Sequence, residues 1–414
     1  MKHPACIFID RGWVELEGST AYRYIANKDT SDFLDSQAYK SKEGVYWPAL
    51  KKTSRTPKFN EPDRPIQFVS SYEMKRFNLV SRYTEYAPVQ VIEALKFLCE
   101  IQKYCLENGH FLETHMWNVI LSHGRPLLID IGDFFKYKKT SSDDHKVIQS
   151  LISSFRESED NHSPIHFSKF IANYRSFIED INKALHQENT SIIDKVDAVL
   201  NLISQAEPTT KNGYWTDYAK EEWTETKQIP MLYNNKSHSL CEYIKEKKPK
   251  TVFDVGCNNG IYSLYAASLG AECMGVDTDA TSVQQANRLA SSKNLNASFV
   301  CYDIMKDQPA YSLNGVYQKP TERFISEMVI APAVYHHLFR QGHSSKSIVT
   351  ELVKYSSKYL CLEFIPHNDT YIDTSLTSWD MLDNVLHHLK ESGFETVIRN
   401  SHPYPRVWIM AEKK

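Results

Sequence analysis

Acidic side chains end three apolar segments in the C-terminal half of the chain. Asp254 precedes "VGCNNG", Asp277 ends "CMGVD" and Asp303 ends "FVCYD". Carboxylates at such positions can accept hydrogen bonds from ammonium groups, ribose hydroxyls or exocyclic amines. A lone acid at the end of a strand is more often a helix cap, but three acids in register predict a ligand site.

The glycine loop after Asp254 indicates the kind of ligand. Gly256 and Gly260 lie where a strand should end and a helix should begin. Such a turn presents backbone N–H groups and a helix N-terminus to a ligand. Dinucleotide-binding loops carry glycine where Asn258 stands, so a pyrophosphate is not expected. The loop suits a ligand that joins a cationic amino acid to an adenosine, with Asp254 facing the charge.

The elements around these acids alternate in type. Apolar runs predict five strands, at 251–255, 272–276, 298–302, 327–332 and 359–365. Helical spacing predicts four helices, at about 260–269, 279–293, 343–357 and 378–392. The alternation predicts an α/β fold, with a parallel sheet covered by helices on both faces. The last two strands, "FETVIRN" and "RVWIMAEK", have too short a connection for a crossover helix and should form an antiparallel hairpin.

Residues 211–414 resemble the class I S-adenosylmethionine-dependent methyltransferases, whose first three motifs are similar to "FDVGCNNG", "GVDTD" and "CYDI". The resemblance implies a Rossmann-like, seven-stranded sheet and S-adenosyl-L-methionine as the cofactor. It places on the methionine side Asp254, Gly256, Asn258 and Gly260. It places Asp277 at the ribose and Asp303 at the adenine, with Ile304 of the same motif also binding the cofactor. A segment at 214–227 would cover the cofactor, which adds as candidates Trp215, Tyr218 and Lys227.

The acceptor side should lie beyond the fourth strand, where the sequence reads "APAVYHHLF". Methyl transfer needs an aligned nucleophile, and a histidine that titrates near neutrality suits a general base. We expect the neighbours His336 and His337 to point in different directions, so that one at most is the base. Alternatively, they cap the next helix or pack under the loop. Glu363, the third catalytic candidate, could orient a histidine or bind a sugar hydroxyl.

A metal-assisted site is the alternative at this position. It would bring together four side chains, Glu327, His336, His337 and Glu363, on a divalent cation. Their spacing matches no compact ligand motif, so no metal is expected.

Residues 1–138 mix short strands with polar loops and contain one clear helix, "VQVIEALKFLCEIQKYCLEN". The stretch "FLETHMWNVILSHGRPLLIDIGDF" resembles the catalytic loop and metal-binding turn of kinase-like phosphotransferases, which implies metal-binding roles for Asn118 and Asp130. Glu113 stands where that family has its catalytic aspartate, and no glycine-rich loop precedes it. We expect a degenerate kinase-like α+β domain over 1–138 and a helical connector over 139–210.

A shortened kinase-like segment ahead of "TERFISEMVIAPAVYHHL" and "LEFIPHND" resembles bacterial methyltransferases of the nodulation-protein type. The resemblance implies O-methylation of a sugar, a polysaccharide intermediate or a related small metabolite. Two kinds of alternative remain. One is a bifunctional phosphotransferase–methyltransferase, and the other is an RNA methyltransferase or a non-catalytic S-adenosylmethionine-binding module.

Composition and charge restrict the partners and the cellular location that we expect. The formal charge of the 414 residues is −3, which disfavours a nucleic-acid partner. No apolar run is long enough to span a membrane, and the eight cysteines form no CxxC pair. We therefore expect a cytoplasmic protein with a small-molecule or glycan acceptor, whose oligomeric state the sequence does not indicate.

Overall fold

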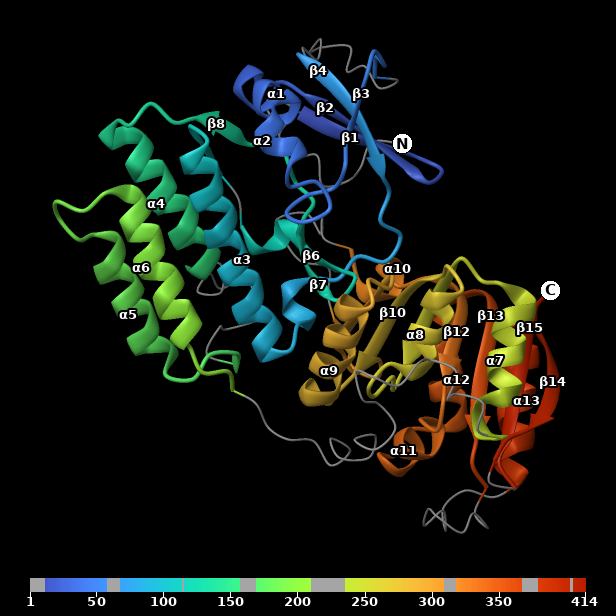
Figure 1. Cartoon of the computed structure of the whole chain (residues 1–414). Helices are drawn as coiled ribbons and strands as arrows, with labels where there is room; N and C mark the ends of the chain where they lie inside the picture. Colours follow the sequence, from blue (N-terminus) through green and yellow to red (C-terminus); the bar gives the residue numbers. More distant parts are fainter. Residues whose placement is uncertain are drawn as a thin grey trace.

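The computed structural model describes residues 12–57, 68–113, 115–156, 169–209, 235–308, 318–366, 379–402 and 405–414. An N-terminal α+β part lies beside a C-terminal α/β part (Figure 1). None of the helices in the described ranges combines the length and apolar character needed to cross a bilayer.

The N-terminal part begins with an antiparallel sheet in the order β1-β2-β4-β3. Its strands are β1 (Gly12–Glu17), β2 (Thr20–Ile25), β3 (Lys51–Thr53) and β4 (Ser70–Lys75). Two short helices, α1 (Lys28–Asp35) and α2 (Gln37–Lys40), connect β2 to β3. The Asn27 side chain caps α1 by accepting from the backbone N–H of Asp29. The Phe33 side chain of α1 is fully buried among the rings of Tyr39, Trp47 and Phe134.

Helices form the other half of this part, around α3 (Pro88–Glu107). Proline at the first position of α3 fits the start of a helix, where its missing N–H costs nothing. The remaining elements are η2 (Tyr83–Glu85), β5 (His110–Leu112), η3 (Met116–Asn118), β6 (Val119–Ser122), β7 (Arg125–Leu128), β8 (Phe134–Lys136), α4 (Ser141–Arg156), α5 (Tyr174–Leu185) and α6 (Ile192–Gln205). Both α4 and α6 pack on α3, so the predicted connector region shares a core with the helix before it.

Within the helical connector predicted over 139–210, α5 starts only after a non-helical segment. It begins at Tyr174, because Asn173 adopts a left-handed backbone (φ +53°) and Ile171 forms an isolated bridge with Pro208. This pairing across the chain lies directly before the start of α5.

The C-terminal part contains one seven-stranded sheet in the order β11-β10-β9-β12-β13-β15-β14. Its strands are β9 (Thr251–Val255), β10 (Glu272–Asp277), β11 (Ala297–Cys301), β12 (Ser326–Ala331), β13 (Ser356–Phe364), β14 (Phe394–Asn400) and β15 (Val407–Lys413). The first five are parallel, and β15 is antiparallel to both β13 and β14. This confirms the predicted Rossmann-like sheet with its C-terminal antiparallel hairpin.

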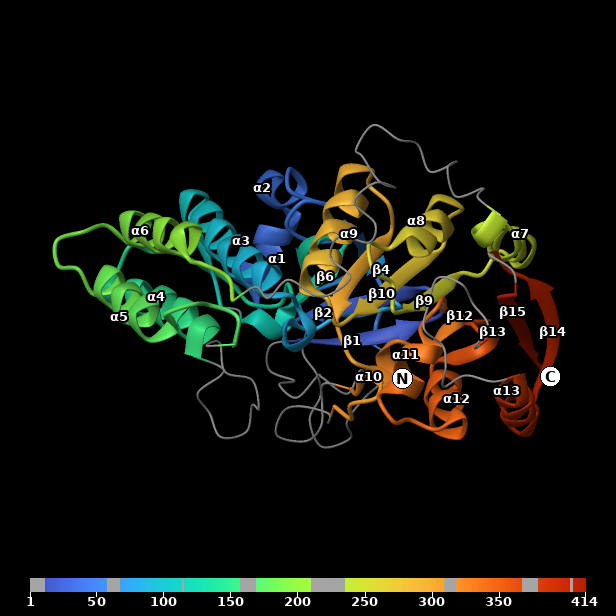
Figure 2. The ribbon, with the colours of Figure 1, turned by 90° about the horizontal axis from the view of Figure 1, so that it is seen from below.

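Helices cover both faces of this sheet (Figure 2). One face packs on α7 (Asn235–Lys247), α8 (Ile261–Ser268) and α9 (Ala280–Ser292), and the other on α12 (Ser345–Lys354) and α13 (Trp379–Glu391). Two short helices flank β12, α10 (Pro320–Arg323) before it and α11 (Tyr335–Arg340) after it. The sequence did not predict α7 or α11.

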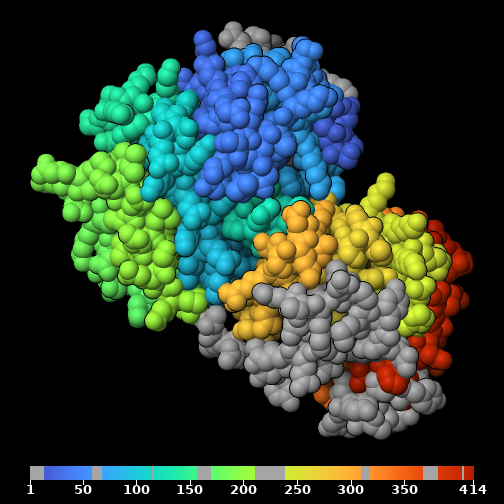
Figure 3. Space-filling view, viewed as in Figure 1, coloured from blue at the N-terminus to red at the C-terminus, as the bar shows by residue number. Residues whose placement is uncertain are grey.

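The two parts meet through polar contacts from the segment between β4 and α3 and from the first turn of α3. The Glu272 carboxylate accepts from the backbone N–H groups of Asn78 and Leu79, each at 2.9 Å. The Gln90 side chain donates to the carbonyl of Phe299 on β11. In Figure 3 the orange segment that contains α9 touches the blue-to-teal N-terminal part. The outer edge of the sheet at β11 is therefore covered.

A buried ion pair completes this junction. Arg323 of α10 pairs with the carboxylate of Glu85 of η2, and both side chains are less than a tenth exposed. Arg323 also donates to the carbonyl of Val80. Buried charges of this kind are tolerated when they are paired and hydrogen-bonded, so the pair depends on both parts being in place.

Candidate active site

The glycine loop lies at the carboxyl end of β9, as the sequence predicted. Backbone N–H groups of Gly256 and Cys257 both donate to the carbonyl of Val276 on β10, at 2.9 and 3.0 Å. Gly256 (φ +67°), Asn258 (φ +47°) and Gly260 (φ +76°) all adopt left-handed backbones. These conformations turn the chain sharply between β9 and α8, and the backbone N–H groups of Gly256, Cys257, Asn258 and Gly260 are all hydrogen-bonded within the protein.

The two glycines have different neighbours. A Cβ atom at Gly256 would lie 2.9 Å from Cγ2 of Val334, in the loop after β12. A Cβ atom at Gly260 would overlap the ring of Phe299 on β11. Gly256 therefore lets a neighbouring loop approach the site, whereas Gly260 is needed for the packing of α8 against the sheet.

Asp254 is fully buried beneath the loop. Its Oδ2 accepts a hydrogen bond of 2.7 Å from Ser263 of α8, and its Oδ1 has no partner among the described residues. Burial, with a smaller contribution from the negative charge of Asp277, raises the pKa of Asp254 to about 7 against the opposing effect of Ser263. A buried carboxylate oxygen without a partner is costly, and a cationic ligand group would satisfy it.

Asp277 connects the loop to β10. Its two oxygens accept from the backbone N–H groups of Asn258 (2.8 Å) and Asp279 (2.9 Å). Burial raises its pKa although these N–H groups lower it. Each oxygen keeps a second lone pair, so the carboxylate can also accept from a pair of ligand hydroxyls.

Asp303 follows β11 at the same edge of the sheet. One oxygen accepts from the backbone N–H of Met305 (3.0 Å), and the other lies 3.3 Å from Nζ of Lys306. The adjoining Ile304 is buried. Asp303 therefore caps its own turn, and adenine binding by Asp303 and Ile304 stays a prediction.

The histidines follow a strained loop beside the glycine loop. Ala333 has a left-handed backbone (φ +50°), which is unusual for a residue with a side chain, and Val334 contacts Gly256. The rings of His336 and His337 lie 3.9 Å apart between centroids, so the expectation that they point apart was wrong. His336 is 1% exposed and His337 is half-buried. Burial, and then Arg340, lower the pKa of His337, which keeps its imidazole neutral at pH 7.

Glu363 lies on the α8 face of the sheet, apart from the histidines. The register β9-β12-β13 aligns Asp254, Ile330 and Cys361, so Glu363, two residues on, shares the face of Asp254. Tyr335 of α11 packs instead on Phe364, on the opposite face. Glu363 is fully buried, accepts from the Ser401 hydroxyl at 2.7 Å, and has no partner for Oε2 among the described residues. It therefore contacts a serine and orients neither histidine.

The four-residue metal alternative is wrong. Glu327 stands at the start of β12, where its carboxylate accepts from the backbone N–H of Lys250 at 2.7 Å. The histidines follow the other end of the same strand, so Glu327 cannot share an ion with them. In the described ranges, one group of three metal-capable side chains lies close together, namely His387, His388 and Glu391 of α13.

Ser263 and Ser401 were missed by the sequence analysis. Ser263 lies three residues after Gly260, and such a polar residue near the start of an apolar helix could have indicated a buried partner. Ser401 follows β14, and nothing in the local pattern pairs it with Glu363. The candidates Trp215, Tyr218 and Lys227 lie outside the described residues.

In the N-terminal part, the resemblance to kinase-like phosphotransferases predicted a metal-binding role for Asp130, but its carboxylate is already paired within the protein. The carboxylate of Asp130 contacts the guanidinium of Arg23 on β2 and accepts from the backbone N–H of Gly132. Burial alone would raise the pKa of Asp130, but Arg23 and His115 lower it. Thr30 of α1 donates to the carbonyls of Gly132 and Phe134, so α1 is fixed to the same turn.

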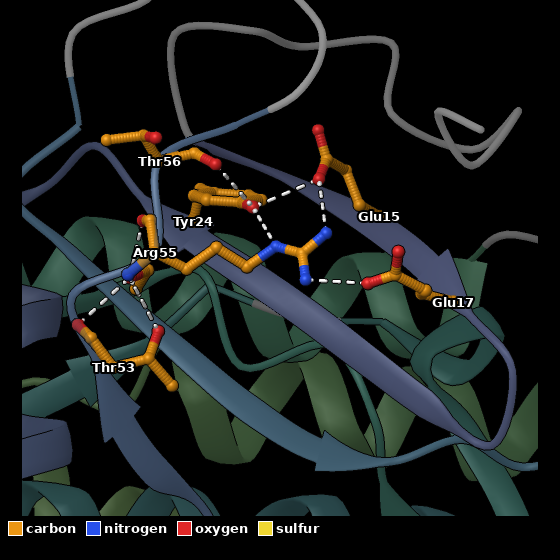
Figure 4. A network of polar contacts seen from close by, with 7 residues as sticks. Glu15, Glu17, Tyr24, Thr53, Arg55 and Thr56 are labelled. Atoms are coloured by element: carbon orange, nitrogen blue, oxygen red, sulfur yellow. Dashed lines mark hydrogen bonds and ion pairs between the residues drawn. The ribbon is translucent and has the colours of Figure 1, made fainter.

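A second arginine of this part is also engaged (Figure 4). The Arg55 guanidinium lies 2.6 Å from the carboxylate of Glu17, 3.6 Å from that of Glu15 and 3.2 Å from the hydroxyl of Tyr24. Its backbone N–H donates to Thr53, and its side chain stacks on the ring of Tyr22. Both Arg23 and Arg55 therefore have carboxylate partners within the protein.

Comparisons with known proteins agree with the geometry of the glycine loop. Residues 252–318 match the family model described as "Methyltransferase domain". The chain is 27% identical over 164 residues to nodulation protein NoeA of Rhizobium meliloti, which covers 38% of the chain and 33% of that protein. It is 37% identical over 97 residues to the chloroplastic tocopherol O-methyltransferase of Arabidopsis thaliana, which covers 20% of the chain and 28% of that protein.

Solved structures of methyltransferases resemble this chain only at low sequence identity. A magnesium protoporphyrin IX methyltransferase from Synechocystis with bound S-adenosylhomocysteine is 16% identical, at a TM-score of 0.35 over 49% of the chain and 97% of its own. The bifunctional kinase-methyltransferase WbdD is 16% identical, at a TM-score of 0.36 over 48% of the chain and 46% of its own. Scores this low carry no functional weight.

The chain therefore carries a methyltransferase domain over residues 252–318. The chain spans about a third of the length of the curated relatives that it matches, at 33% and 28%. The family match ends at residue 318, before the strand that leads to the histidines.

Proposed function

We propose that the chain is an S-adenosylmethionine-dependent O-methyltransferase whose acceptor is a sugar, a polysaccharide intermediate or a related small metabolite. The observation that carries the proposal is Asp254, a fully buried carboxylate under a glycine loop, whose Oδ1 lacks a partner among the described residues. The residues fit the cofactor, because Asp254 would hold its ammonium group and Asp277 its ribose hydroxyls. Gly256 and Asn258 would line the methionine side, with Asp303 and Ile304 at the adenine.

The bound cofactor supplies a methyl group on a sulfonium, and the protein must align an acceptor with it and remove a proton. His337 is the better base of the two histidines, since it is half-buried and its lowered pKa keeps the imidazole neutral at pH 7. His336, at 1% exposure, would hold the His337 ring in place through their contact. Val334, which precedes α11, brings this loop to Gly256 and so to the methionine side.

An oxygen acceptor is favoured by the similarity to a tocopherol O-methyltransferase. The sugar class of acceptor rests on the resemblance to methyltransferases of the nodulation-protein type. Glu363 would serve the acceptor rather than the base, because its Oε2, which has no partner within the described ranges, is suited to a hydroxyl donor.

The test separates binding from turnover. Calorimetry with S-adenosylhomocysteine should give binding to the wild type, a large loss in Asp277→Ala, and no change in His337→Ala. Production of S-adenosylhomocysteine should then be measured with monosaccharide, oligosaccharide and tocopherol acceptors, where His337→Ala should lower turnover by about 10²-fold or more, a loss of the order expected for a general base. Equal loss of cofactor binding in both variants would contradict the assigned roles.

The bifunctional alternative is disfavoured by the Arg23–Asp130 pair. A guanidinium already pairs with Oδ1 of Asp130, and α1 is hydrogen-bonded to the same turn. We therefore expect no heat on titration with Mg-ATP. Binding of Mg-ATP that disappears in Asp130→Ala would instead establish a phosphotransferase site.

A further inference from the structure

The outer edge of β14 exposes apolar side chains. This strand ends the seven-stranded sheet, and no described strand pairs with its outer side (Figure 2). Val397 and Ile398 are neighbours in β14 and are 60% and 45% exposed. An exposed strand edge with apolar residues is a site where another strand can add.

The backbone of β14 has a defined set of free groups at this edge. The N–H of Lys414 donates to the carbonyl of Gly393, and the N–H of Ser401 to that of Arg406. In the β14–β15 register, odd-numbered residues of β14 therefore bond to β15, and the even-numbered ones point outward. The Asn400 carbonyl accepts from Ser239 of α7 at 2.9 Å, so the accessible groups are those of Phe394, Thr396 and Ile398.

We propose that a second copy of this chain pairs with this edge, through its own β14, about a twofold axis at Val397. In this antiparallel register Thr396 faces Ile398 of the second copy. Both residues point their N–H and C=O groups outward, so the two equivalent pairs can form four hydrogen bonds. The two Val397 side chains meet at the axis and cover one another. Such a contact is isologous, because both copies use the same surface.

Charge complementarity selects this register. Glu395 faces Arg399 of the second copy, and Arg399 faces the second copy's Glu395. A shift of the twofold axis by one residue toward either end of the strand would place Glu395 opposite Ser401 or opposite Val397 instead. Within one copy, Glu395 pairs with Lys414 and Arg399 with Glu246, both at exposed positions where ion pairs contribute little. These side chains can therefore turn to the second copy at small cost.

The proposed contact leaves the glycine loop open. The loop follows β9, and three strands, β12, β13 and β15, separate β9 from β14. Variants at this edge should therefore leave binding of S-adenosylhomocysteine unchanged, which serves as a test of folding.

The experiment measures mass by sedimentation velocity over a wide range of concentrations. The wild type should be a dimer, and Glu395→Arg and Arg399→Glu should each be monomeric, because each places like charges opposite one another. An equimolar mixture of the two variants should form dimers again, because opposite charges face one another in mixed pairs. The double variant E395R/R399E should also be a dimer.

A further variant tests the backbone contribution. Thr396→Pro removes an outward N–H and leaves the β15 pairing intact, so it should be monomeric. A wild type that is monomeric at every concentration would overturn the proposal. So would a mixture of the two charge variants that is no more dimeric than either variant alone.

Discussion

Cofactor affinity should depend on pH through Asp254. Its pKa of about 7 in the ligand-free protein means that the carboxyl is mostly protonated at pH 6, whereas an ammonium ligand requires the ionised form. The ionised fraction falls about tenfold between pH 8 and pH 6, so the dissociation constant of S-adenosylhomocysteine should rise about tenfold over that range. Binding at pH 6 should release close to one proton per site.

The assay is calorimetry at several pH values in two buffers that differ in their heat of protonation. Asp254→Asn keeps the shape of the side chain but cannot ionise, so its affinity should be weak and independent of pH. Ser263→Ala removes the hydrogen bond that lowers the pKa of Asp254, so the loss of affinity should begin at a higher pH. A wild type without pH dependence, or the same dependence in Asp254→Asn, would refute the reasoning.

The same carboxyl should affect the stability of the ligand-free protein. Its pKa lies at about 7 in the folded state and near the reference value of 3.8 when unfolded, so the folded state binds the proton more tightly. The free energy of unfolding should therefore fall as the pH rises from about 4 to 7, by up to about 4 kcal/mol. Denaturant titrations of the wild type and Asp254→Asn at both ends of this range would measure the difference.

Two further predictions concern the framework of the site. Arg323→Ala leaves the buried Glu85 without its partner and should destabilise the protein by about 3–5 kcal/mol; a loss below about 1 kcal/mol in denaturant titration would mean that the pair is not buried in solution. Gly260→Ala should lower the thermal midpoint more than Gly109→Ala, because both sites have left-handed backbones (φ +76° and +72°) but only a Cβ at Gly260 meets the Phe299 ring. Equal shifts in the two variants would contradict the packing role of Gly260.

The glycine loop and its sheet could be predicted because their signals are local. Buried parallel strands appear in the sequence as apolar runs. Three of these runs have an acidic residue at or near their end, namely Asp254, Asp277 and Asp303. The common position of the three acids then follows from the topology, since parallel strands bring their carboxyl ends to one edge of the sheet. Three positions separated by up to 49 residues could thus be placed together from the amino-acid sequence alone.

The failures involve contacts that local patterns do not encode. Arg23 and Asp130 are 107 residues apart, so no sequence window contains both. Glu327 was grouped with the histidines by residue type alone, although the predicted strand at 327–332 already placed them at opposite ends of β12. The ring contact between His336 and His337 depends on side-chain rotamers in a short helix that the apolar spacing did not reveal.

The pair between Glu85 and Arg323 also has a consequence for biosynthesis. The two residues are 238 positions apart, and a ribosome adds roughly 5–20 residues per second, so Arg323 is made roughly 12–50 s after Glu85. During that interval Glu85 lacks the guanidinium that pairs with it, whereas Glu272 and Phe299, which bind the neighbouring segment, are made before Arg323. The N-terminal part is therefore translated first but can reach its final packing only after Arg323 has been made.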